Sequence, residues 1–73
     1  MNVEQTIRAE MVASVHSVVV AVGDPVDVGD TLVILESMKM EMPVESPVDG
    51  RVKEIRVKEG QAVAEGDVLA VVE

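Results

Sequence analysis

The chain has 73 residues, about half the usual length of a domain, so we expect one domain spanning residues 1–73. Six basic residues against fourteen acidic ones give a formal net charge of −8, and so acidic a surface repels phosphates and argues against nucleic-acid binding. The sequence has no cysteine, which excludes disulfides and thiolate metal sites, and its one histidine, His16, cannot by itself form a zinc cluster or a histidine-based triad. No apolar run approaches the roughly 20 residues of a membrane span, and residues 1–8 lack the apolar stretch of a signal peptide, so we expect a soluble, cytoplasmic protein.

Valine dominates the apolar residues, with eighteen Val against three Ile, three Leu and no aromatic residue. Because β-branched side chains fit a pleated surface better than a helix, this composition predicts an all-β fold. Glycines and prolines divide the chain into short segments, as is typical of a sandwich or barrel.

The first predicted strand covers residues 14–20, and a matching strand covers residues 51–57. Apolar residues occupy positions 15, 18 and 20 of the first strand and positions 52, 55 and 57 of the second. A spacing of three followed by two breaks the strict alternation of a strand, so we predict a β-bulge in each.

Each of these strands is followed by the motif Gly-x-x-Val-x-x-Gly-Asp and then by a second strand, predicted at residues 31–36 and 68–73. The glycines suit turn positions with positive φ, and the valine between them, Val26 or Val63, is expected to point inward. Asp30 and Asp67 recur at the same place in both motifs, which indicates a role in the turn.

These elements form an internal repeat, because a shift of 37 positions aligns residues 11–36 with residues 48–73 with eight identities in 26 positions. Neither unit is large enough to close a core alone, but two units packed face to face around an approximate two-fold axis are. We therefore predict a flattened β-barrel or sandwich of two small antiparallel sheets.

Residues 37–45 join the two units and have no partner in this repeat. They contain three of the five methionines, and a β-hairpin is the natural connection over so few residues. Alternation along the returning strand places Met42 in the core, and Glu36, Glu41 and Glu45 are expected to face solvent. A two-fold arrangement puts this hairpin at one end of the domain, with Lys39 at its tip, and both chain termini at the other end.

The hairpin sequence Glu36-Ser37-Met38-Lys39-Met40, flanked by the glycine motifs, resembles the biotinyl/lipoyl carrier domains. The likeness is to the biotin carboxyl carrier branch and its small stand-alone attachment proteins, and it covers residues 6–73. Ser37 stands where this family usually has alanine.

The resemblance implies that Lys39 is joined by an amide bond to biotin by a separate biotin protein ligase. It also implies partnership with biotin carboxylase and carboxyltransferase components, and no catalytic residue or metal in the carrier itself. Met38 and Met40 are then contacts for the ligase or partner. The family's tight hairpin has Met38 and Lys39 at its two central positions, and a type I′ turn there requires positive φ at both.

Two alternatives stay open. The chain could be a lipoyl carrier of a 2-oxo acid dehydrogenase or glycine cleavage system, although that branch typically has an acidic residue where this chain has Met38. It could also be an unmodified interaction module that reuses the fold. An isolated exposed lysine is most often a solubilising charge, and His16, aligned with Lys53 in the repeat, is read as an exposed strand residue without a functional role.

Overall fold

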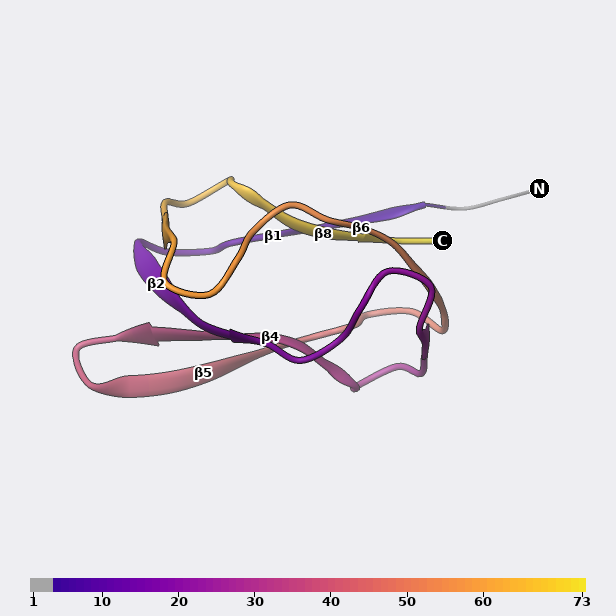
Figure 1. The fold of residues 1–73 in the computed structure, drawn as a ribbon, viewed down its shortest axis with the longest axis horizontal. Helices are drawn as coiled ribbons and strands as arrows, with labels where there is room; N and C mark the ends of the chain where they lie inside the picture. Colours follow the sequence, from indigo (N-terminus) through magenta and orange to yellow (C-terminus); the bar gives the residue numbers. More distant parts are fainter. Residues whose placement is uncertain (1–3) are drawn as a thin grey trace.

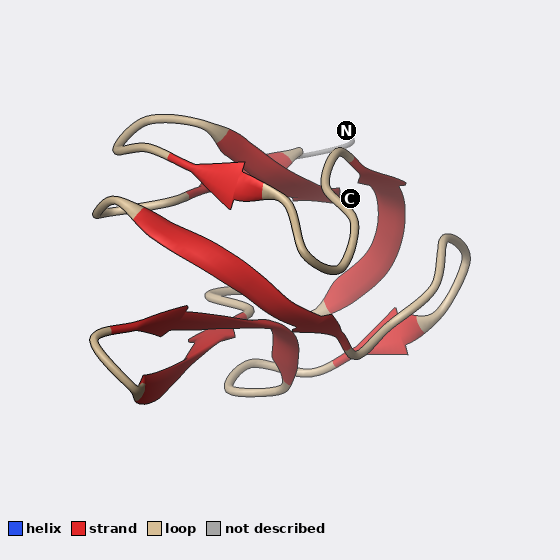
Figure 2. Ribbon diagram, turned by 60° about the vertical axis from the view of Figure 1, so that its left-hand side comes forward, coloured by secondary structure: helices blue, strands red, loops and turns tan. Residues whose placement is uncertain are grey.

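The computed structural model describes residues 4–73 and builds them into two four-stranded antiparallel sheets that face each other, without any helix in this range (Figures 1 and 2). The strands are β1 (Gln5–Arg8), β2 (Ala13–Val18), β3 (Pro25–Val26), β4 (Thr31–Ser37), β5 (Met40–Glu45), β6 (Gly50–Ile55), β7 (Ala62–Val63) and β8 (Val68–Val72). Their order is β1-β8-β6-β3 in one sheet and β5-β4-β2-β7 in the other. The predicted all-β sandwich is confirmed, and no helix of the described part is long and apolar enough to cross a membrane.

Each sheet is the repeat copy of the other. β1 pairs with β8 through Ile7 and Ala70, and β5 pairs with β4 through Val44 and Val33, which are the same positions shifted by 37. The structural repeat therefore extends to β1 and to residues 42–45. The expectation that residues 37–45 lack a repeat partner is wrong for residues 42–45, because β1 and β5 share a backbone register but almost no residue identities.

The two units are held together by the exchange of their glycine turns. The Gly23 amide donates to the Val52 carbonyl, and the Gly60 amide donates to the Val15 carbonyl, both over 2.8 Å. Val15 and Val52 donate in return to the carbonyls of Gln61 and Asp24, over 2.8 and 2.9 Å. Each turn is thus bonded to a strand of the other unit, which explains why one unit alone leaves backbone groups unpaired.

Both predicted bulges are present. The register of β2 against β4 shifts between Val15 and Ser17, and that of β6 against β8 shifts between Val52 and Glu54. The predicted strands at residues 14–20 and 51–57 extend two residues past the observed ends of β2 and β6, because the chain leaves the sheet there toward the glycine turns.

The glycine motifs adopt the predicted turns. Gly29 and Gly66 both have φ of +91°, a conformation that other residues rarely adopt. The Asp30 carboxylate accepts the amide hydrogen of Asp27 over 2.8 Å, and Asp67 does the same for Ala64 over 2.9 Å, so both aspartates act in the turns as predicted. The two-residue strands β3 and β7, which the sequence did not suggest, lie inside these motifs and bury Val26 and Val63.

The core between the sheets is built from small aliphatic side chains of both units. Its most deeply buried members are Val15, Leu32, Val33, Val52, Leu69 and Val72. No aromatic ring is needed because the two sheets lie close together and β-branched side chains fill the layer between them.

The molecule is elongated, with principal extents of 39 × 18 × 17 Å. The β4–β5 hairpin projects at one end, and the start of β1 and the C-terminus lie at the other, as predicted (Figure 1). The N-terminal residues 1–3 lie outside the described range. The fold therefore separates the hairpin tip from the chain ends by the full length of the domain.

Gly50 provides a test of the packing between β6 and the end of the chain. A Cβ atom at this position would lie 2.3 Å from the backbone oxygen of Glu73, which exchanges two hydrogen bonds with Arg51. We expect Gly50→Ala to displace Glu73 and lower the free energy of unfolding by about 2 kcal/mol, measured by urea titration. Glu59→Ala on an exposed loop is the control and should change stability by less than about 0.5 kcal/mol. Equal midpoints for the two variants would contradict the contact.

Candidate functional site

The tip of the β4–β5 hairpin is a two-residue loop. Ser37 and Met40 form the last cross-strand pair, and Met38 and Lys39 between them have φ of 52° and 65°. Positive φ at both central positions of a two-residue loop is the mark of a type I′ turn, a turn type that the sequence alone left open. Asparagine and glycine adopt this conformation readily, whereas Met38 and Lys39 are held in it by the strands on either side.

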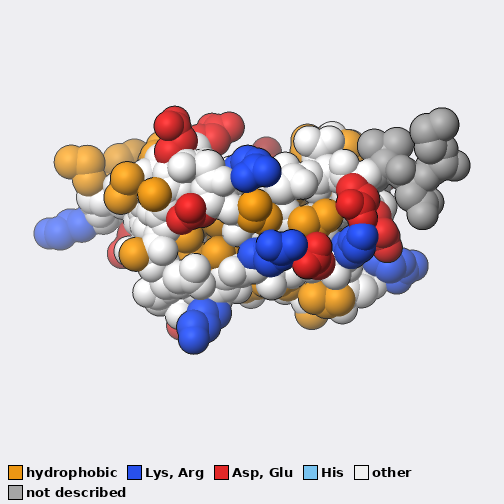
Figure 3. All heavy atoms as spheres, turned by 90° about the horizontal axis from the view of Figure 1, so that it is seen from above, with side chains coloured by type: hydrophobic (Ala, Val, Ile, Leu, Met, Phe, Trp, Pro, Cys, Tyr) orange, Lys and Arg blue, Asp and Glu red, His pale blue; other side chains and the backbone are white. Residues whose placement is uncertain are grey.

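All three residues at the tip face solvent. Met38 is 92% exposed, Met40 is 65% exposed and Lys39 is exposed between them. Figure 3 shows hydrophobic side chains gathered at this end of the molecule beside a basic side chain. The ion pairs of the described residues join His16 to Glu41, Glu4 to Lys53 and Glu54 to Arg56, so none of them involves the Lys39 amine.

The base of the hairpin is fixed to the body of the domain. Met42 is half-buried and packs against the core, as predicted from alternation, and Leu35 opposite it is fully part of the core. The exposed tip therefore stands on a hairpin base that is packed into the sandwich.

The hairpin surface is acidic close to the tip. Glu36 and Glu41 are directly opposite each other on β4 and β5, and both are exposed, as predicted, together with Glu45. Like charges in a cross-strand pair disfavour a hairpin. Among the ion pairs of the described residues, one reaches this pair, from His16 Nε2 to Glu41 Oε1 over 3.9 Å. Placing residues 38 and 39 in the turn already implies this register, so the acidic pair can be derived from the sequence once the turn is fixed.

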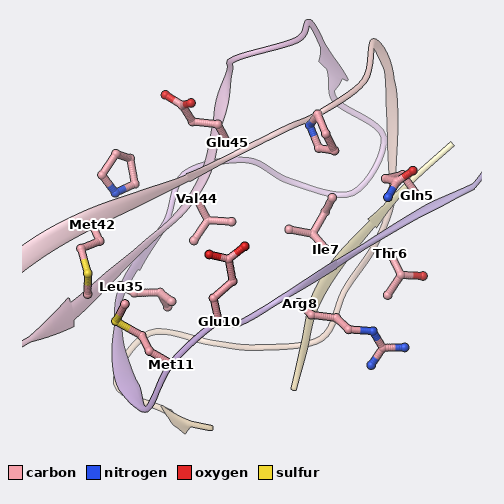
Figure 4. Close-up of a pocket in the computed structure, with 12 residues that line it drawn as sticks. Gln5, Thr6, Ile7, Arg8, Glu10, Met11, Leu35, Met42, Val44 and Glu45 are labelled. Carbon is pink, nitrogen blue, oxygen red and sulfur yellow. The ribbon is translucent and has the colours of Figure 1, made fainter. Parts of the chain in front are cut away.

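A groove of about 520 Å³ lies between the edge strands β1 and β5 (Figure 4). Most of the residues that line it occupy equivalent positions in the two repeat units. Ile7 and its equivalent Val44 lie near the middle, and Met42 lies toward the hairpin. Lys39, Met38 and Met40 are all absent from its lining. The groove and the hairpin tip are therefore separate features of the surface.

The shifted pKa values belong to groups on or just after β6. The Glu4 carboxylate, by hydrogen bonding and charge attraction, raises the pKa of Lys53. The hydrogen bond from Arg56 lowers the pKa of Glu54. These exposed pairs lie outside the hairpin, and no group of three or more potential metal ligands occurs among residues 4–73.

The tip presents one exposed primary amine, which makes no ion pair within residues 4–73, on a hairpin whose base packs against the core. It brings together the three site residues predicted from the sequence, Met38, Lys39 and Met40, and adds the acidic pair Glu36 and Glu41 behind them. Such an arrangement suits a covalent attachment point that another protein modifies.

Comparison with known proteins agrees with this description. A model of the biotin–lipoyl family, described as "Biotin-requiring enzyme", matches residues 5–72. The chain is 50% identical over 68 residues to the biotinylated protein TB7.3 homologue of Mycobacterium leprae, and the match covers 93% of this chain and 96% of that protein.

Much longer proteins contain a similar segment. The chain is 42% identical over 67 residues to pyruvate carboxylase of Staphylococcus aureus, covering 92% of this chain and 6% of that protein. The solved structure of Kluyveromyces lactis urea carboxylase superposes with a TM-score of 0.91 at 36% identity, covering 100% of this chain and 6% of that chain.

The type I′ turn holds Met38 in a left-handed conformation that methionine adopts poorly, so a residue better suited to this conformation should stabilise the domain. Asparagine tolerates the left-handed conformation better than methionine, so we expect Met38→Asn to raise the free energy of unfolding by about 0.5–1 kcal/mol, measured by urea titration. Met40→Asn, one step outside the turn, is the matched control and should give no gain. A loss of stability in Met38→Asn would refute the assignment of strain to this turn.

Proposed function

Because this chain belongs to the biotin–lipoyl family and is a biotin-carrier domain homologous to those of carboxylases, we propose that Lys39 is the residue that a biotin protein ligase joins to biotin. The observation that carries the proposal is the place of Lys39 at the exposed centre of the type I′ turn. The other two lysines, Lys53 and Lys58, lie on β6 and on the loop that follows it.

The tip residues fit such a group. The amine of Lys39 is accessible and engages no ion pair among residues 4–73, and the neighbouring Met38 and Met40 offer a ligase an apolar surface on both sides. Biotin, once attached, supplies the ring nitrogen that carries a carboxyl group between active sites.

The role of the chain itself is to position the attached group. The paired strands of the hairpin hold the Cα atom of Lys39 in place while its four-carbon side chain samples the space around the tip, which raises the effective concentration of the attached group at the sites it visits. Amide formation removes the positive charge of Lys39, so the net charge of the chain changes from −8 to −9.

We propose further that catalysis resides in the partners. Relatives of this chain include a protein named for its biotinylation and segments of a pyruvate and a urea carboxylase, in which a similar domain forms 6% of the chain. Biotin carboxylase and carboxyltransferase components would load and unload the arm, and a cytoplasmic location belongs to the same proposal. Which acceptor receives the carboxyl group depends on those components.

The attachment site has a direct test by intact mass spectrometry. Co-expression with a biotin protein ligase should add one biotinyl group to the native chain, and Lys39→Arg should remain folded and gain none. Lys53→Arg and Lys58→Arg are the matched controls and should be modified like the native chain. A biotinyl group retained in Lys39→Arg would refute the site, and the mass of a lipoyl group would identify the chain as a lipoyl carrier.

A further inference from the structure

The two repeat units differ sharply at one pair of equivalent loops. Residues 19–28, here called the valine loop, connect β2 to the turn before β4, and residues 56–65 form the same path in the second unit. Three valines of the valine loop are strongly exposed, namely Val19 at 53%, Val22 at 62% and Val28 at 63%. The residues at the equivalent positions are Arg56, Glu59 and Glu65, all of them exposed and charged.

The contrast extends to the remaining exposed positions of the two loops. Ala21 and Pro25 of the valine loop correspond to Lys58 and Ala62. Residues 19–28 therefore contain five exposed apolar residues and residues 56–65 contain two, Ala62 and Ala64, the second of which stands at the position of Asp27. Equivalent backbone hydrogen bonds form in both places. The amide of Asp24 donates to the Ala21 carbonyl over 3.1 Å, as that of Gln61 does to Lys58. The amides of Val19 and Arg56 donate over 2.9 Å to the carbonyls of Leu32 in β4 and Leu69 in β8.

This internal comparison shows that folding does not require the valines. The second unit forms the same turns with charged side chains, so an apolar side chain at these positions brings no structural gain that the fold needs. Exposed apolar residues that cluster in one segment are typical of a surface that another protein covers.

The valine loop lies at the end of the molecule that carries the start of β1 and the C-terminus, whereas residues 56–65 lie at the hairpin end (Figure 1). A protein bound to the valine loop would leave Met38, Lys39 and Met40 free. This position suits a partner that holds the carrier while the modified lysine is at work, and it does not suit the ligase, which must reach the tip.

The charges around the valine loop indicate the kind of surface that fits it. Asp24, Asp27 and Asp30 are exposed within or just after the loop, and Asp49 accepts the amide hydrogen of Val28 over 2.8 Å. The basic group against them is Arg51, whose Nη1 donates to the Gly23 carbonyl over 2.7 Å. Four carboxylates against one guanidinium favour a partner with basic side chains around an apolar centre, and they disfavour a second copy of this chain.

We infer that the valine loop is a docking surface for the carboxylase that this carrier serves, which meets it with an apolar patch rimmed by lysine or arginine. The inference rests on the proposed function for the identity of the partner. The inference states that the carboxylase binds the domain at the end opposite Lys39, through contacts that do not involve the hairpin tip.

The internal repeat supplies the variant that tests this docking surface. Val19→Arg, Val22→Glu and Val28→Glu together install the side chains of the second unit, and the same turns already accommodate them there. Thr6→Glu on β1 is the control, because it changes the net charge by the same amount on another exposed residue. Val22→Glu alone serves if the triple variant does not fold.

The measurement is the carboxylation reaction of the assembled carboxylase from the same cell, freed of its own carrier and titrated with each biotinylated variant. We expect the triple variant to raise KM for the carrier by about tenfold with kcat unchanged, and the control to leave both unchanged. Added salt should raise KM for the native chain, because the rim contacts are ionic. An unchanged KM in the folded triple variant would overturn the inference.

Two further readouts separate this inference from the proposed function. The triple variant should gain biotin at the native rate, and a loss of biotinylation in a folded variant would assign the loop to the ligase and overturn the inference. Direct binding of the unmodified chain to the same carboxylase tests the surface even if Lys39 carries no biotin. Sedimentation of the native chain as a dimer that the triple variant abolishes would assign the loop to a second copy, again against the inference.

Discussion

The constraint on which the structure depends is that each repeat unit must receive a turn from the other. The paired hydrogen bonds between Gly23 and Val52 and between Gly60 and Val15 bind the units reciprocally. A unit alone would expose both a strand without its turn and an aliphatic face without its cover. The core can therefore close only when both units are present, which explains how a chain of 73 residues without aromatic residues or disulfides reaches a defined fold.

This mutual dependence also explains why the hairpin can be specialised. The sandwich is closed by contacts among the glycine turns and the central strands, so the tip beyond the pair Ser37–Met40 is not needed for the core. The left-handed backbone of Met38 and Lys39 and the like charges of Glu36 and Glu41 are local costs that the rest of the domain supports. Departures from local preference at a tip that the core does not need are typical of a functional site.

Sequence alone predicted the features that are repeated or chemically distinctive. The bulges of β2 and β6, the glycine turns, the exposure of Met38 and Met40 and the hairpin at residue 39 all follow from residues that recur or stand out. The strand β1 was missed because Gln5–Arg8 shares only apolar character, at Ile7 and Val44, with its repeat partner in β5. The strands β3 and β7 were missed because two residues carry no periodicity. The groove between β1 and β5 depends on how the sheet edges approach each other, which no local pattern records.

The repeat has a topological consequence for the chain ends. β8 and β1 pair as β4 and β5 do, so the position that Met38 and Lys39 occupy in one unit corresponds in the other to the gap between the end of β8 and the start of β1. At one end of the molecule the two paired strands β4 and β5 are joined by a turn, whereas at the other end the equivalent strands β8 and β1 are not joined to each other. A polypeptide fused to either chain end would be attached at the end of the domain opposite Lys39, and the domain is 39 Å long. Pivoting about such a joint would carry the arm through an arc set by the length of the domain, in addition to the reach of its own side chain.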